Sequence, residues 1–93
     1  MLETEPFDPA KYLHSPEAQK ELLDDALDSG EAAYIAHALG IIARARGMTE
    51  VARSANVTRE ALYKSLSMDG DPRLSTLLGV TRALGFKLSA RPA

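Results

Sequence analysis

The sequence predicts an all-α domain of five helices, followed by a short C-terminal β-strand. Apolar residues recur at helical spacings of three and four along most of the chain, and helix start and stop signals separate the segments. Hydrophobic residues make up 45% of the 93 residues but aromatic residues only 5%, so the core must consist of alanine, leucine, isoleucine and valine. Alanine favours closely packed helices, and a chain of this length forms one small domain.

The first helix is expected at residues 16–28, after an N-terminal segment, residues 1–14, that Pro6 and Pro9 interrupt. We predict that this segment is loosely ordered and that the folded domain covers residues 15–93. Serine, proline and glutamate at positions 15–17 form a helix start, with a capping hydroxyl, proline at the first position and an acid in the first turn. The apolar face of this helix carries Leu22, Leu23, Ala26 and Leu27, and Ser29-Gly30 ends it.

The second helix is expected at residues 31–46, where Ile35, Leu39 and Ile42 recur at spacings of four and three. Arginines in its last turn complement the helix dipole, and a glycine at position 47 follows as a stop signal. Gly40 interrupts this helix at a cost of about 1 kcal/mol relative to alanine. Close contact with a neighbouring helix would explain that cost.

The third and fourth helices are expected at residues 49–55 and 58–66, joined by a tight turn. Asn56 lies where the chain must bend, and asparagine tolerates left-handed backbone angles. Thr58 can cap the following helix by accepting a hydrogen bond from a free amide. An apolar seam would hold the pair at a fixed angle: Val51, Ala52, Ala55, Val57, Leu62 and Leu66. Residues 49–66 thus carry a helix-turn-helix signature, in which the second helix lies in the DNA major groove.

The fifth helix is expected at residues 73–84, after turn residues 67–72. We expect the core-facing side chains of this helix to be Leu74, Leu77, Leu78, Thr81 and Leu84. Gly85 ends the helix. Residues 86–90 alternate apolar and polar side chains, which predicts a short strand. An isolated strand is unstable, so this one needs a symmetry mate or a strand of a protein partner, and otherwise it is a frayed tail.

Charge is distributed unevenly along the chain. The net charge is −2, but residues 1–30 carry −6 and residues 31–93 carry +4. Phosphate binding needs a locally positive surface, and the basic part contains the helix-turn-helix. The acidic first helix is either a dock for a basic partner or a solvated face.

Cysteine is absent from the sequence, which excludes disulfides and thiolate metal sites and fits a reducing cytoplasm. No apolar run approaches the ~18 residues that span a bilayer, so we expect a cytoplasmic protein without a membrane partner. Small size, the unpaired strand and the paired half-sites that such motifs bind together predict a homodimer.

Seven side chains are the candidate DNA contacts: Thr49, Arg53, Thr58, Arg59, Glu60, Tyr63 and Lys64. Arg59 and Glu60 lie near the start of the second motif helix, where side chains reach base edges; arginine bonds both acceptors of guanine and glutamate accepts from cytosine. Thr49, Arg53 and Thr58 are expected to contact phosphates near helix starts. The remaining two have alternatives: Lys64 reads a base or phosphate or pairs with Glu60, and Tyr63 contacts the DNA backbone or joins the core.

Catalytic and cofactor sites are not expected. His14 and His37 lie 23 positions apart and lack a ligand-spaced neighbour, and Asp24 and Asp28 share an exposed helix face that is more typical of solvated carboxylates. A glycine-rich phosphate loop, a nucleophile elbow and zinc-ligand spacing are all missing from the sequence. We therefore predict a protein that is not an enzyme and binds neither a cofactor nor a metal.

The motif, the loop after it and the helix ending at Gly85 resemble the lambda-repressor-like class of DNA-binding domains. With the flanks added, the chain resembles the addiction module antidote proteins, the small antitoxins of type II toxin–antitoxin systems. The resemblance covers residues 7–90 and rests on Phe7-Asp8 with Tyr12-Leu13, on residues 38–48, 59–64 and 83–89, and on Met68-Asp-Gly-Asp-Pro72. That family more often has Gly-Asn-Pro in the last segment, and a larger residue where this chain has Gly79.

The resemblance implies two activities: neutralising a toxin of the ribonuclease-like RelE/HigB kind by direct binding, and repressing the module's own operator. The toxin-binding candidates come from the acidic helix and the segment before it: Phe7, Tyr12, Leu13, Glu21, Asp24 and Asp28. Addition of the C-terminal strand to a toxin sheet is the other mode considered. Two alternative functions remain, a stand-alone phage-type repressor and a protein-interaction module without DNA binding.

Overall fold

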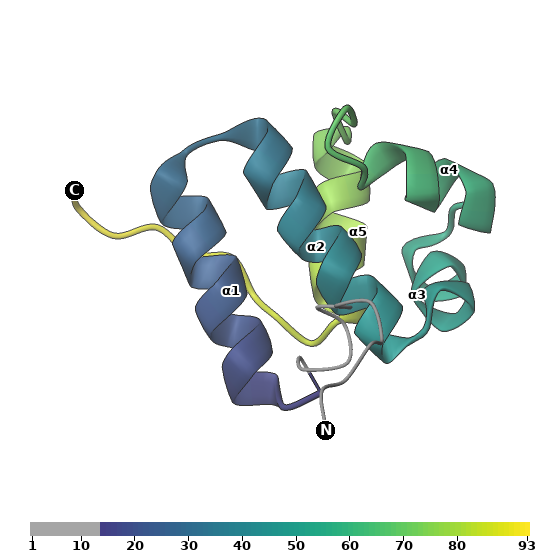
Figure 1. Ribbon diagram of the computed structural model, residues 1–93, viewed down its shortest axis with the longest axis horizontal. Helices are drawn as coiled ribbons and strands as arrows, with labels where there is room; N and C mark the ends of the chain where they lie inside the picture. The colour runs from purple at the N-terminus through teal and green to yellow at the C-terminus, as the bar shows by residue number, and fades with distance from the viewer. Residues whose placement is uncertain (1–13) are drawn as a thin grey trace, which may run out of the picture.

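The computed structural model describes residues 14–93, which form five helices and, within that range, no strand (Figure 1). The helices are α1 (Pro16–Ser29), α2 (Ala32–Arg46), α3 (Met48–Ala55), α4 (Arg59–Ser65) and α5 (Leu74–Ala83). The expected all-helical class is therefore confirmed, and each helix lies within a few residues of its expected position. The segment predicted to be loosely ordered, including Phe7, Tyr12 and Leu13, lies outside the described residues but for His14.

Local capping signals in the sequence set the helix ends. The Ser15 hydroxyl accepts a hydrogen bond from the Ala18 amide at 3.1 Å, and Pro16 occupies the first position of α1. Gly30 ends α1 in the left-handed region at φ 69°, and its amide donates to the Leu27 carbonyl. Gly47 separates α2 from α3 at φ 111°, a value that side chains disfavour. Gly47 is thus the single residue between the end of α2 and the start of α3.

The turn between α3 and α4 is built as the sequence predicts. Asn56 takes left-handed angles, φ 61° and ψ 42°, and is the only residue other than glycine with positive φ among those described. Thr58 then caps α4, because its hydroxyl accepts from the Ala61 amide at 3.0 Å. Together these two residues fix the direction in which α4 leaves α3.

The core lies where α2, α3, α4 and α5 meet. α3 packs against α2, α4 and α5, while α1 packs along α2. The largest fully buried apolar side chains come from α2, from α4 and from α5 with its C-cap: Leu39, Ile42, Leu62, Val80 and Leu84. Of the predicted seam, Val51, Ala52, Leu62 and Leu66 are buried, and Ala55 and Val57 are partly buried against the same cluster. This packing holds α4 at the edge of the domain with its outer side free.

Gly40 of α2 lies against the backbone of Leu66, the residue that ends α4. A Cβ atom at this position would lie 2.7 Å from the Leu66 carbonyl oxygen, a distance that real Cβ atoms do not show. The expected close contact is confirmed, although the contacting group is the backbone that ends α4.

Two predictions for the C-terminal part are wrong. Residues 86–90 form no strand within the described chain, because a strand needs a partner and residues 14–93 supply none. Instead, the Phe86 amide donates to the Thr81 carbonyl and the Phe86 ring packs on the core. Leu74 and Leu78, expected to point inward, are 68% and 41% exposed. Helix α5 turns Val80, Thr81 and Leu84 inward, which places Leu74 and Leu78 on a neighbouring row.

Asn56 allows a stability test of the α3–α4 turn. Replacing it with alanine is expected to lower the free energy of unfolding by about 1 kcal/mol, because a β-carbon disfavours the left-handed region and alanine lacks the local hydrogen bonding of asparagine. Replacing it with glycine should leave stability unchanged or raise it slightly. Urea denaturation of the three proteins measures the difference. Equal stability of the alanine and glycine variants would contradict the strained-turn argument.

Candidate nucleic-acid interface

The outer side of α4 presents charged and polar groups to solvent. Arg59, Glu60, Tyr63 and Lys64 are exposed, while Leu62 on the same helix is fully buried. The core role considered for Tyr63 does not hold, because 44% of this residue is exposed. One short helix therefore combines a buried anchor with an outward row of hydrogen-bonding side chains.

Arg59 is held by contacts from two helices. Its Nη1 donates to Thr49 Oγ1 at 3.4 Å and its Nη2 donates to the Tyr63 hydroxyl at 3.4 Å. The guanidinium carbon also lies 5.5 Å from the centroid of the Tyr63 ring, within the range of a cation–π contact. The hydrogen bond to Tyr63 raises the pKa of Arg59 above its ordinary value. The two hydrogen bonds orient the guanidinium. Because both are long, they are weak and can be exchanged for stronger bonds to a ligand.

The other four candidates are exposed but less closely connected. Arg53 forms an ion pair with Glu50 at 3.0 Å on the open side of α3. Thr58 is exposed and uses its hydroxyl to cap α4. Glu60 and Lys64, both within the described part of the chain, form no ion pair with each other, so the pairing considered from their spacing is absent. The structure thus brings Thr49 and Tyr63 each into contact with Arg59.

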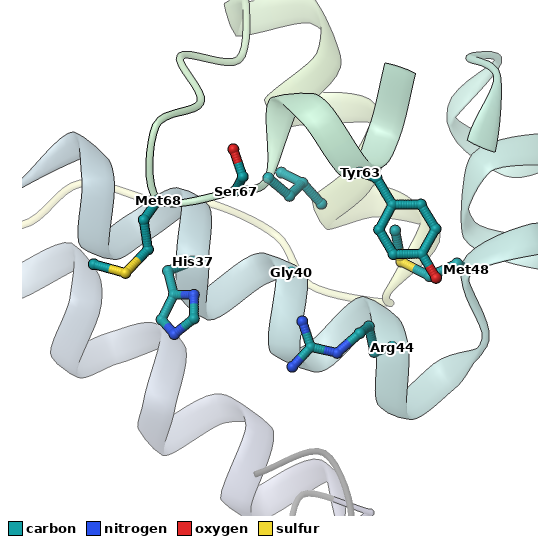
Figure 2. Close-up of a pocket in the computed structure, with 8 residues that line it drawn as sticks. His37, Gly40, Arg44, Met48, Tyr63, Ser67 and Met68 are labelled. Atoms are coloured by element: carbon teal, nitrogen blue, oxygen red, sulfur yellow. The ribbon is translucent and has the colours of Figure 1, made fainter. Parts of the chain in front are cut away.

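A hollow of about 270 Å³ next to this surface was not predicted from the sequence (Figure 2). Helix α2 contributes His37, Gly40 and Arg44 to its wall, and Tyr63 and Met68 face them from α4 and the loop after it. His37 and Arg44 share this face because seven residues are close to two helical turns. In the sequence, Arg44 has a sufficient explanation as one of the arginines that complement the helix dipole. Nothing in the sequence indicates that it also lines a hollow beside Tyr63.

The acidic candidates lie on α1, apart from this interface. Glu21 is exposed, Asp24 is hydrogen-bonded to Lys20 at 2.6 Å, and Asp28 forms an ion pair with Arg91 at 3.7 Å. The Lys20 ammonium lowers the pKa of Asp24. Asp24 and Asp28 thus each have a basic neighbour, which reduces the negative charge of this part of α1.

The described residues hold no group of three or more metal-binding side chains. His14 is exposed and His37 is partly buried in the wall of the hollow. Among helices of the described part, none combines the length and apolar character needed to cross a bilayer.

Comparisons with known proteins give two matches. A protein-family model described as "Probable addiction module antidote protein" matches residues 3–92. A protein of Haemophilus influenzae named "Uncharacterized protein" is 40% identical over 85 residues, which cover 91% of this chain and 88% of the relative. No solved structure matches.

Proposed function

The chain belongs to the addiction module antidote family, and from that premise we propose that it is the antitoxin of a type II toxin–antitoxin module. In this proposal it binds and neutralises a RelE/HigB-like toxin in the cytoplasm. It also represses its own operon as a homodimer, with α4 of each copy in the major groove of an operator half-site.

The observation that carries the DNA-binding part is the exposed side of α4 with Arg59 held by Thr49 and Tyr63. An arginine whose orientation is already restricted loses less side-chain entropy when it binds both acceptors of a guanine. Glu60 and Lys64 lie on the same helix within reach of neighbouring bases or phosphates. Leu62 and Leu66, both buried, brace the helix from behind.

The toxin-binding part rests on charge and position. A toxin that cleaves RNA needs a positive surface, and the N-terminal 30 residues of this chain carry −6. Helix α1 and helix α4 lie at opposite ends of the molecule (Figure 1). The two surfaces are therefore far enough apart for toxin and DNA to bind at the same time.

The decisive experiment is co-purification with the product of the adjacent gene. We expect a stable complex, and we expect that deleting residues 1–14 or replacing Glu21 and Asp28 with lysine weakens it on the order of tenfold or more. Glu60→Lys is the matched control, because it reverses an acid that is also exposed but lies on α4, so it should leave toxin affinity unchanged while disturbing DNA binding. A neighbouring gene product that does not bind, with operator binding intact, would favour the stand-alone repressor. Toxin affinity unchanged by both the deletion and the Glu21 and Asp28 substitutions would reject this surface.

A further inference from the structure

Helix α5 and the tail after it expose an apolar surface that residues 14–93, the part the structure describes, leave open to solvent. Leu74 and Leu78 stand one turn apart on α5, 68% and 41% exposed. Beside Leu78 lies a hollow of about 350 Å³, lined also by Thr81, Arg82, Phe86, Lys87 and Leu88. We call Leu74, Leu78 and this hollow the α5 surface. Contiguous exposed apolar patches of this kind, when large, mark surfaces that bind another protein.

We propose that the α5 surface binds a second copy of this chain, with the two α5 helices antiparallel about a two-fold axis near Leu78. This inference rests on the proposed function, which includes a homodimer, and assigns the interface of that homodimer. It replaces the pairing of C-terminal strands, which the structure does not support.

The shape of the surface fits this arrangement. Leu74 protrudes at the start of α5, and the hollow lies at its other end, around Arg82 and Phe86. Eight residues separate Leu74 from Arg82, about 12 Å along a helix. A two-fold axis midway between them places Leu74 of each copy at the hollow of the other. Such an interface is self-complementary and closes after two copies.

The charges at the two ends of α5 support the antiparallel direction. Asp69 and Asp71 precede the helix, and with Arg73 they leave its start net acidic. Arg82 and Lys87 border the hollow at the other end. Antiparallel helices bring the acidic end of one copy to the basic end of the other, whereas parallel helices would face like charges. The charge pattern therefore selects one orientation.

This interface would also fix the spacing of the two DNA-binding helices. α5 packs against α3, which packs against α4, so the motif is attached to the interface through helix contacts within one core. Two copies joined at α5 therefore present two α4 helices in one relative orientation, as recognition of paired half-sites requires.

Sedimentation of the free protein tests the dimer. We expect wild type to sediment at twice the 10.0 kDa chain mass at micromolar concentration. Leu74→Asp should raise the dimer dissociation constant by about 100-fold or more, because each dimer contains the change twice. Met68→Asp is the matched control, since Met68 is 62% exposed and lies outside the α5 surface. A monomeric wild type, or a Leu74→Asp variant that stays dimeric, overturns the proposal.

Cross-linking tests the position of the axis and does not depend on how well Leu74→Asp folds. Because the chain has no cysteine, Leu78→Cys introduces a single thiol, which we expect to form an intermolecular disulfide on oxidation. Met68→Cys should still dimerise but should not form an intermolecular disulfide under the same conditions. Absence of the Leu78→Cys cross-link overturns the antiparallel arrangement.

A charge exchange tests the orientation further. Arg82→Asp should weaken the dimer, and adding Asp71→Arg should restore it; failure of the second change to restore it counts against the pairing.

Toxin co-purification of Leu74→Asp separates this inference from the proposed function. A monomeric variant that still captures toxin supports both proposals. A monomeric wild type whose toxin binding is lost with Leu74→Asp overturns the dimer and assigns the α5 surface to the toxin.

Discussion

Arg59→Ala is expected to weaken binding to the operator upstream of the module by about 5- to 150-fold per half-site. This range corresponds to the ~1–3 kcal/mol of discrimination that a bidentate arginine–guanine contact supplies. The fold should persist, because Arg59 is exposed and its contact with Tyr63 contributes only about 0.5–1 kcal/mol at such a site. Titration of labelled operator, together with urea denaturation, separates the two effects.

Two control variants test whether Arg59 reads a base and whether Tyr63 orients it. Arg53→Ala should weaken operator and unrelated DNA alike, and should reduce the salt slope by about 1, as loss of a phosphate contact does. Tyr63→Phe keeps the ring against Arg59 but removes the hydroxyl that accepts from Nη2, so it tests whether this bond orients the guanidinium. Unchanged operator affinity for Arg59→Ala would remove this residue from the base-reading set.

The elements that the sequence predicted correctly depend on local interactions. Thr58 caps α4 through an amide three residues away, and Asn56 needs only its own backbone preference to end α3. Gly40 was also informative, because glycine inside a helix is unfavourable unless a neighbour requires it. The conformational preferences of Thr58 and Asn56 are thus set within one turn of the chain. The cost of Gly40 in a helix follows from its missing β-carbon.

The incorrect predictions concern how α5 is rotated about its axis and what the tail contacts. Leu74, Leu77, Leu78 and Thr81 all fit a helical apolar pattern, and that pattern does not say which adjacent rows face the core. In the structure, the row that faces the core contains Val80 and Leu84. A strand at residues 86–90 required a partner that the alternation of side chains cannot supply.

The candidate site lies between these cases. Exposure of Arg59, Glu60 and Lys64 follows from the burial of Leu62 one helix face away, and the Arg59–Tyr63 contact follows from their spacing of four. The bond from Arg59 to Thr49 joins residues ten apart on different helices and depends on the angle of the turn. The hollow beside Tyr63 depends on how α2 passes α4 and has no local signal in the sequence.

Gly40→Ala is expected to lower the free energy of unfolding by about 1–3 kcal/mol, although alanine is the better helix former. The added Cβ would lie 2.7 Å from the Leu66 carbonyl oxygen, which belongs to the backbone and cannot rotate away. Relief requires α2 and the end of α4 to separate, and such overpacking typically costs 1–3 kcal/mol. Because Leu66 also anchors α4 in the core, the variant should lose operator affinity as well as stability.

Gly79→Ala is the matched control for Gly40→Ala, because Gly79 is also a glycine inside a helix that contacts a neighbour. Here the added Cβ would lie 3.4 Å from the Ala55 carbonyl oxygen and 3.5 Å from its Cα, which is ordinary van der Waals contact. The helix propensity of alanine should then dominate and raise stability by about 0.5–1 kcal/mol. Thermal unfolding should show midpoint shifts of opposite sign, on the order of 4–8 °C per kcal/mol. Stabilisation by both substitutions would mean that α2 does not contact the Leu66 backbone at Gly40 and that other core contacts hold α4 in place.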